Sequence, residues 1–337
     1  MFENNIRQSL EGVKLAEPIV QDSLTIFPLV GDDRPGANYL TLDEALRDGL
    51  AEVTETSEQG SVPQLFFENK ADIPILLVDG EELLGAKQNR VLNLTILVRP
   101  KSKITIPVSC VEAGRWAFQH RRFSSSDRTM HARSRASKVA QVSASLRSKF
   151  DRVSDQGAVW REIEEKQRRM GTASPTRAMS ASYEHFRADV DKFVEAMRPK
   201  AVQRGAVFMV NGTVAGIELF DRAETYAKLA PKLVRSYAIE AIEFPAETSE
   251  KPDAGAAASS FDRVGKLKIE AYPGTDLGND LRLDGAEMKG AALAADGAIL
   301  HLEAFTKHWD SADLRAPMDE KRAAHDARGG EARSRPR

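Results

Sequence analysis

The sequence predicts an α+β protein with a largely antiparallel β-sheet, a helical insertion and a disordered C-terminal tail. Short apolar runs bounded by Gly, Pro, Asn and Asp recur as far as Cys110, which is typical of strands joined by turns. Between residues 130 and 199 the apolar residues change to helical spacing. Residues 311–337 hold almost no large apolar side chains, so we expect them to be disordered.

The N-terminal part predicts strands on either side of a short helix. Residues 19–30 and 63–67 are apolar runs between turn-forming residues. Between them, Thr41 precedes the segment LDEALRDGL, and Glu44 stands three residues after Thr41. This spacing is a capping box, in which each of the two side chains accepts a hydrogen bond from a backbone N–H of the other residue. It predicts a helix that begins after Thr41 and is closed by Gly49.

Three further apolar runs predict the clearest sheet in the chain: IPILLVDG, VLNLTILV and ITIPVSCVE. The sequence RPKSK between the last two predicts a hairpin turn over residues 99–103. Pro107, inside the last run, indicates an edge strand or a bulge, because proline has no N–H to give to a neighbouring strand.

The middle of the chain predicts about three helices. Apolar residues recur at helical spacing over residues 139–150, 160–170 and 183–197, and Pro199 ends the last stretch.

A hairpin and a long helix follow. Asn211-Gly212 stands between two apolar runs and predicts a tight β-turn, because both positions tolerate positive φ. Residues 223–242 predict a helix in which Pro231 either makes a kink or starts a second helix.

These elements divide the chain into four parts. Residues 1–244 predict one α+β domain with its helical section at about 130–199. Residues 245–260, rich in Pro, Ala, Gly and Ser, predict a linker or loop. The alternating runs KLKIEAY and GAILHLEAF make residues 261–310 a C-terminal β segment, which the tail at 311–337 follows.

Composition excludes several classes of protein. With 337 residues, 42% of them hydrophobic and 29% charged, the chain is globular and has the length of about two domains. No apolar stretch approaches the roughly 20 residues of a membrane-spanning helix. The single cysteine allows no internal disulfide, and no secretory signal is visible. We therefore expect a cytoplasmic protein that does not enter a membrane.

Charge is unevenly distributed. Residues 1–100 hold 8 Lys and Arg against 17 Asp and Glu, a balance of about −9, whereas residues 115–177 hold 15 against 6, about +9. The basic block can contact nucleotide or nucleic-acid phosphates, or it can dock on acidic residues of the same chain. We favour an internal or solvated block over one that contacts phosphates, since charged helical faces usually face water.

Strand parity places several polar residues together. In the predicted hairpin the even-numbered residues of both strands form one apolar face, because side chains alternate with period two. The two faces coincide when paired residue numbers add up to 200 or 202. At 200, Arg90 lies opposite Cys110 and Gln88 opposite Glu112, and at 202 Arg90 lies opposite Glu112. In both registers these four residues line the mouth of the apolar face, near Lys87, Asn89 and Asn93.

This mouth has two interpretations. Arg90 and Glu112 can be an ordinary ion pair that closes the sheet edge, or the polar residues can line a pocket, because an unpaired buried charge is very costly. Cys110 shares the parity of the apolar residues and is therefore expected to be buried and inert rather than nucleophilic. The histidines lack metal-ligand spacing, so we expect no metal site, and His301 is expected to be a surface or packed residue.

Residues 78–116, VDGEELLGAKQNRVLNLTILVRPKSKITIPVSCVEAGRW, resemble the signature of a prokaryotic family named for its association with ADP-ribosylglycohydrolases and rhodanese-phosphatase proteins. The layout of the helices and of the Asn211-Gly212 hairpin extends the resemblance over about residues 15–245. It implies a role in processing or sensing NAD-derived or ADP-ribosylated molecules. The family pattern matches Glu81, Glu82, Gly85, Lys87, Gln88, Asn89, Arg90, Asn93, Ser109, Cys110, Glu112, Arg115 and Trp116.

We therefore expect a domain that binds or processes a nucleotide-related ligand, NAD-derived or ADP-ribose-like. The ligand-binding candidates are Lys87, Gln88, Asn89, Arg90, Asn93, Arg115 and Trp116, and the acid/base candidates are Glu82 and Glu112. ADP-ribose-processing proteins are the expected partners, no cofactor is specified, and catalysis stays open. The alternative is a non-catalytic interaction module that uses its basic helical face to bind a protein or nucleic acid.

Overall fold

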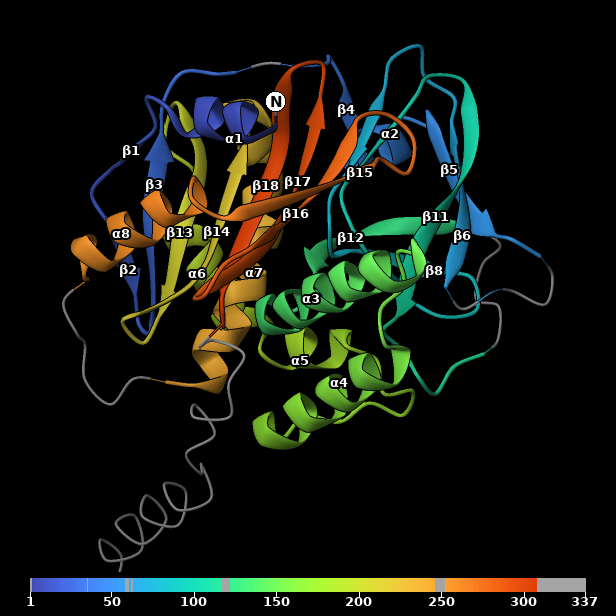
Figure 1. Ribbon diagram of the computed structural model, residues 1–337. Helices are drawn as coiled ribbons and strands as arrows, with labels where there is room; N and C mark the ends of the chain where they lie inside the picture. The colour runs from blue at the N-terminus through green and yellow to red at the C-terminus, as the bar shows by residue number, and fades with distance from the viewer. Residues whose placement is uncertain are drawn as a thin grey trace, which may run out of the picture.

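The computed structural model describes residues 2–34, 36–57, 61, 63–116, 122–245 and 252–307 (Figure 1). It confirms the α+β class, with large antiparallel sheets and helices packed beside them. The predicted disorder of residues 311–337 concerns a part of the chain that lies outside the described residues.

The largest sheet has nine strands and combines both ends of the chain. Its spatial order is β1-β3-β13-β14-β18-β17-β16-β15, with β2 paired to β3, and every pairing is antiparallel. Because β18 pairs with β14, the C-terminal strands continue the sheet that the N-terminal strands begin. The strands are β1 (Lys14–Leu15), β2 (Ile19–Gln21), β3 (Leu24–Val30), β13 (Gln203–Val210), β14 (Thr213–Phe220), β15 (Lys268–Pro273), β16 (Asn279–Asp284), β17 (Met288–Ala295) and β18 (Ala298–Thr306).

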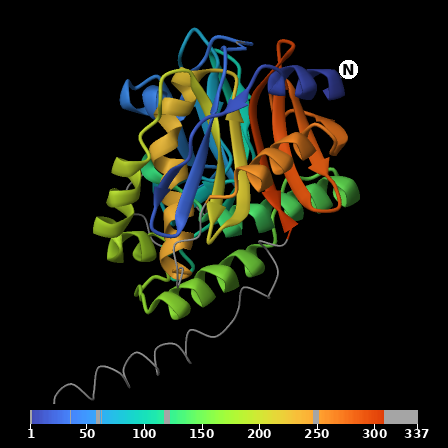
Figure 2. The ribbon, with the colours of Figure 1, turned by 90° about the vertical axis from the view of Figure 1, so that its left-hand side faces the viewer.

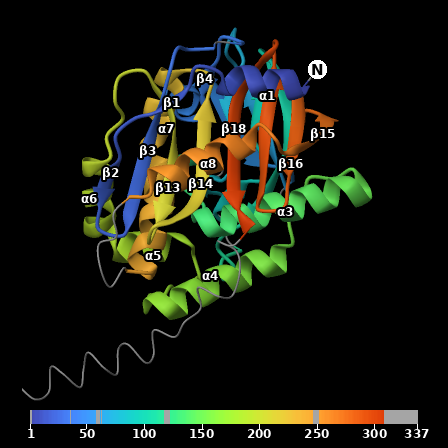
Figure 3. The same cartoon turned by 60° about the vertical axis from the view of Figure 1, so that its left-hand side comes forward.

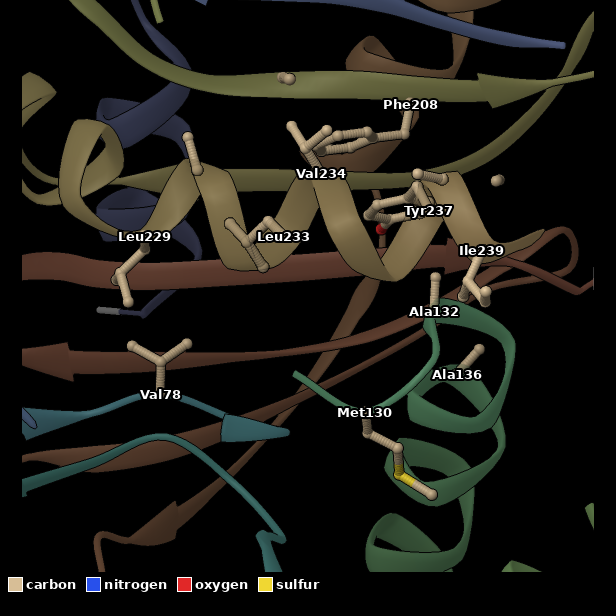
Figure 4. Close-up of a cluster of buried hydrophobic side chains, with 14 of the residues drawn as sticks. Val78, Met130, Ala132, Ala136, Phe208, Leu229, Leu233, Val234, Tyr237 and Ile239 are labelled. Carbon is tan, nitrogen blue, oxygen red and sulfur yellow. The ribbon is translucent and has the colours of Figure 1, made fainter. Parts of the chain in front are cut away.

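Helices cover both faces of this sheet (Figures 2 and 3). On one face, α1 (Phe2–Leu10) and α8 (Ala254–Val264) bury Ile6 and Phe261 against alternate strand residues. On the other face lies α7 (Ala223–Glu243), a single helix in which Pro231 is accommodated without starting a second one. Tyr237 of α7 stacks on Phe208 of β13 with ring centroids 3.9 Å apart (Figure 4).

A second group of strands packs around its own apolar core. One sheet has the order β12-β8-β9-β11-β6-β5, the other β10-β7-β4. The helix α2 (Leu42–Arg47) begins at Thr41 with the predicted capping box, and Gly49 has φ +69° just beyond its end. The strands are β4 (Leu40–Thr41), β5 (Ala51–Glu55), β6 (Gln64–Asn69), β7 (Ile75–Leu77), β8 (Glu81–Gly85), β9 (Arg90–Leu92), β10 (Ile96–Val98), β11 (Ser102–Cys110) and β12 (Phe123–Thr129).

The helical section contains four helices in the described residues, where the spacing predicted about three. They are α3 (Ala132–Lys149), α4 (Gln156–Met170), α5 (Ser180–His185) and α6 (Arg187–Ala196). The periodic run over 183–197 breaks at Phe186, which has φ −100° and ψ 21°. Phe150 is not a core position: it ends α3 in the left-handed conformation and is 77% exposed.

The predicted hairpin around residues 99–103 is wrong in one strand. Residues 92–98 do not form one strand: β9 ends at Leu92, and β10 pairs with β7 in a different sheet. The strand is interrupted at Asn93 and Thr95, whose side chains bond to other segments. Asn93 Oδ1 accepts from Ser109 Oγ, and Thr95 Oγ1 accepts from the backbone N–H of Asp79 at 3.1 Å. The predicted pairing is nevertheless correct for β9. This strand pairs with β11 so that Arg90 lies opposite Cys110, which is the predicted register in which paired residue numbers add up to 200.

Helix α8 occupies part of the segment 245–260, where composition predicted a linker or loop. The side chain of Asp253 caps it by accepting a hydrogen bond from the N–H of Ala256, and Ala257 and Phe261 pack into the core. An N-cap together with one buried apolar face is enough to order an alanine-rich stretch. Residues 246–251 lie outside the described part of the chain.

The Asn211-Gly212 hairpin is confirmed, with φ values of 50° and 71° and Val210 paired to Thr213. Among the described helices, none is long and apolar enough to cross a membrane.

Gly205, in strand β13 of the large sheet, has the least room for a side chain among the described glycines. A Cβ on Gly205 would lie 2.0 Å from the carbonyl oxygen of Glu218 on the paired strand. We expect Gly205→Ala to lower the free energy of unfolding by about 2 kcal/mol or more, because neither strand can move without losing its ladder. Urea unfolding followed by circular dichroism measures this change.

The matched control is Gly157→Ala in the first turn of α4, where the nearest atoms belong to the side chains of Arg161 and Asp155. Alanine is favoured over glycine in a helix, so this variant should be as stable as the wild type or slightly more stable. Equal stability of Gly205→Ala and the wild type would contradict the close strand approach.

Candidate functional site

The turn between β8 and β9 and the C-terminal end of β11 meet at one end of the strands of the six-stranded sheet. Six of the residues that strand parity placed together lie there, joined by the candidates Arg115 and Trp116: Lys87, Gln88, Asn89, Arg90, Cys110, Glu112, Arg115 and Trp116. We call these residues, with Glu55 at the end of β5, the β9–β11 edge site. The structure therefore brings seven of the nine predicted site residues into one place.

Arg90 is the fully buried centre of the edge site. Its Nη1 donates to Gln88 Oε1 and to Cys110 Sγ, both at 2.7 Å. Its Nη2 lies 3.9 Å from Glu55 Oε1, beyond hydrogen-bond range. Among the described residues, Arg90 Nε, Arg90 Nη2 and Glu55 Oε2 are buried without a hydrogen-bond partner. Arg90 and Glu112 thus do not form the ordinary ion pair considered from the sequence.

Cys110 is buried and donates to Gln88 Oε1 at 3.0 Å. Burial raises the pKa of the Cys110 thiol to about 11, although the nearby Arg90 lowers it. A thiol with this pKa stays protonated at neutral pH and is a poor nucleophile. Cys110 is therefore buried, as strand parity predicts, and its burial accounts for the raised pKa of the thiol.

Glu112 and Arg115 hold the segment that follows β11. Arg115 Nε donates to Glu112 Oε2 at 2.8 Å, and its Nη1 donates to the carbonyl oxygen of Ala86 at 2.7 Å. Thr176 Oγ1 donates to the second carboxylate oxygen, Glu112 Oε1, at 2.8 Å. Both oxygens of Glu112 are occupied, so this side chain fixes the loop around the site.

Trp116 carries the exposed surface of the edge site. It is 48% exposed, and its ring centroid lies 5.2 Å from Lys87 Nζ and 5.7 Å from Arg90 Cζ. An indole beside two cations presents an aromatic face and positive charge together.

Glu82 and Asn93 lie elsewhere. Glu82 pairs with Val91 in the β8–β9 ladder, so its side chain points to the face opposite that of Arg90. There Glu82 Oε2 lies 3.3 Å from Arg128 Nε, and burial raises the pKa of Glu82 to about 7. Asn93 Oδ1 accepts from Ser109 Oγ, and Asn93 Nδ2 donates to the carbonyl oxygen of Arg152.

A buried charge network that no sequence motif indicates lies at the centre of the molecule. Arg135 of α3 contacts Glu218 at 2.8 Å, Asp79 at 3.4 Å and Glu303. Lys138 Nζ contacts the same Asp79 and donates to the carbonyl oxygen of Asn93 at 3.1 Å. In the sequence this network consists of an Arg and a Lys three residues apart on one helix and of single acids in three separate strand regions. Such scattered residues cannot be recognised as a cluster without the tertiary contacts.

His301 belongs to this network and is buried. Of the two environments expected from the sequence, surface or packed, the structure shows the packed one. Its Nε2 lies 3.1 Å from Glu218 Oε2, and its Nδ1 lies 2.8 Å from Thr95 Oγ1. His301, Glu218 and Glu303 are of metal-ligand type, with ligand atoms within 4.8 Å of one another. Because Arg135 already neutralises both carboxylates, we assign the three residues to the ion network.

Much of the basic block at 115–177 docks internally. Lys166 contacts Glu240 and Glu243, and Arg169 also contacts Glu243. Arg147 pairs with Glu270 at 2.6 Å. With Arg135, Lys138 and Arg128, these contacts neutralise a large share of the block within the chain.

The thiol of Cys110 gives a direct chemical test. Because the chain has one cysteine, all alkylation reports on this residue. We expect N-ethylmaleimide to label the native protein at least about 100-fold more slowly than the urea-unfolded protein, since the native thiol is buried and protonated. Mass spectrometry over time measures both rates, and native labelling at the unfolded rate would contradict the assignment.

The buried network predicts a dependence of stability on pH. Burial raises the pKa of Glu303 from 4.5 to about 7. The folded state therefore favours the protonated acid, and this contribution to stability is lost as pH rises through that interval. In urea unfolding, Glu303→Gln, which stays neutral, should lose less stability between pH 5 and pH 8 than the wild type.

Glu82 adds to the pH dependence in the same direction and remains in the Glu303→Gln variant. The control is Glu287→Gln, whose side chain is 51% exposed and pairs with Arg263. It should follow the wild-type pH dependence, and the same behaviour from Glu303→Gln would remove Glu303 as the titrating group.

Comparison with known proteins gives one match. No curated protein and no solved structure matches the chain. A family model does match, over residues 12–305, which extends beyond the roughly 15–245 suggested by the sequence and includes the C-terminal strands. The chain belongs to the ARG and Rhodanese-Phosphatase-superfamily-associated Protein domain family.

Proposed function

We propose that the protein binds a nucleotide-like ligand of the NAD or ADP-ribose class at the β9–β11 edge site. The observation that carries the proposal is the half-exposed indole of Trp116 lying over Lys87 and Arg90. An exposed aromatic face stacks on nucleobases and contributes about 1–3 kcal/mol per base. The description of the family, which associates it with ARG and the rhodanese-phosphatase superfamily, is consistent with such a ligand.

Charge supports an anionic ligand. Among five described residues of the site, Lys87, Arg90 and Arg115 carry positive charges and Glu55 and Glu112 carry negative ones, so that these five sum to +1. Arg115 is fixed by Glu112 and Ala86, so the ligand meets a preorganised surface. A phosphate near this surface is attracted by the positive charges, and added salt weakens this attraction by screening.

Acid/base catalysis at this site receives less support. Glu82 has the pKa that a general acid or base needs near neutral pH, but it points to the opposite face of the sheet. Glu112 is on the correct face and has both oxygens engaged. We therefore propose binding as the function and attach no reaction to it.

The alternative, an interaction module with a basic helical face, also receives less support. The contacts of Lys166, Arg169 and Arg147 with carboxylates reduce the charge that a nucleic acid or protein partner could meet.

The test is isothermal titration calorimetry with NAD and ADP-ribose. We expect Trp116→Ala to weaken binding at least tenfold, because the stacking surface is lost. Lys87→Gln should weaken binding and reduce its dependence on salt concentration.

Two matched controls exist on the same chain. Phe150→Ala removes another exposed aromatic side chain, and Lys103→Gln removes another lysine that lies over an aromatic ring, here that of Phe66 at 4.7 Å. Both should bind like the wild type. No heat of binding with either ligand at millimolar concentration would overturn the proposed function.

A further inference from the structure

Three polar atoms inside the edge site have no hydrogen-bond partner among the described residues: Arg90 Nε, Arg90 Nη2 and Glu55 Oε2. The side chains of Arg90 and Glu55 are 0% and 4% exposed, so water does not reach them freely. A buried polar atom without a partner costs about 1–3 kcal/mol. Such an atom in a native protein calls for an explanation, and a bound molecule that supplies the missing partner is one.

The geometry of these atoms specifies the partner. Arg90 Nε and Nη2 are two donors on one edge of a planar guanidinium, and a carbonyl oxygen, with two lone pairs, can accept from both. Glu55 Oε2 is an acceptor beside them, and the 3.9 Å between Arg90 Nη2 and Glu55 Oε1 leaves the two groups apart. The complement is a planar group with a carbonyl oxygen next to an N–H.

We propose that Glu55 and Arg90 recognise the amide edge of the ligand's base or ring, with its carbonyl oxygen on Arg90 and its N–H on Glu55. This inference rests on the proposed function and specifies its ligand class. Trp116 lies 5.7 Å from Arg90 and offers its ring to the same planar group. Glu55, absent from the residues singled out in the sequence, becomes the specificity-determining residue.

Chemical selectivity follows from the two partners. A primary carboxamide, as in nicotinamide, and the lactam edge of a purine such as hypoxanthine both carry the required pair of atoms. A carboxylate in place of the amide meets the negative charge of Glu55 and has no N–H to donate. Adenine presents a ring nitrogen with one lone pair, which cannot accept from both Arg90 donors.

The experiment uses two matched pairs of probes on the full chain by calorimetry. NAD carries a carboxamide where its nicotinic acid analogue carries a carboxylate. Inosine monophosphate carries a lactam carbonyl and N–H where adenosine monophosphate carries an amino group and a ring nitrogen. We expect the amide-bearing member of at least one pair to bind tenfold or more tightly than its match. The pair that discriminates identifies whether the group is a nicotinamide or a purine lactam.

The variant Glu55→Gln is expected to gain affinity for one of the probes. Removing the negative charge should make the nicotinic acid analogue of NAD bind at least threefold more tightly than it binds the wild type. A misfolded protein cannot produce tighter binding. Glu52→Gln, on the same strand and paired instead with Lys70 and Arg122, should leave all affinities unchanged.

The outcomes separate the two proposals. Equal dissociation constants within both pairs, with binding intact, overturn amide recognition and leave the nucleotide-binding proposal in place. Absence of binding by all four probes overturns amide recognition, and absence of binding by ADP-ribose as well overturns both proposals. Where the nicotinamide pair discriminates, an unchanged affinity of Glu55→Gln for the nicotinic acid analogue also removes Glu55 from the specificity role.

Discussion

The fold depends on the guanidinium of Arg135, which joins three carboxylates from separate parts of the chain. Glu218 and Glu303 come from neighbouring strands of the large sheet, and Asp79 comes from the connection between β7 and β8 in the smaller sheets. Removing one member of a buried ion network typically costs 3–5 kcal/mol, because the remaining charges lose their partner. The network therefore fixes the relative position of the two groups of strands around α3.

This position extends to the candidate site through a short piece of backbone. Gly80 follows Asp79 with φ +77°, and a Cβ there would lie 2.8 Å from Arg135 Cδ. The N–H of Gly80 donates to the carbonyl oxygen of Leu92, the last residue of β9. Since β9 begins with Arg90, the ion network and the edge site share one rigid connection.

The two polar clusters have different properties. In the central network, each carboxylate has a cation within ion-pair distance, so its residues serve the structure. In the edge site, Arg90 and Glu55 keep unpartnered atoms next to a half-exposed Trp116. Incomplete pairing beside an accessible aromatic ring is typical of a binding site, because a ligand supplies the missing partners.

Several local features of the fold could be predicted from the sequence. Thr41 and Glu44 identified the start of α2, Asn211-Gly212 identified the hairpin, and strand parity placed Arg90 near Cys110, because capping, turn geometry and side-chain alternation depend on neighbours in the chain. Three further features could not be predicted: β10 joins another sheet, Glu82 faces away from the site, and Glu55 lies in it. These outcomes depend on contacts between residues far apart in the sequence, where burial and pairing energies outweigh local propensity.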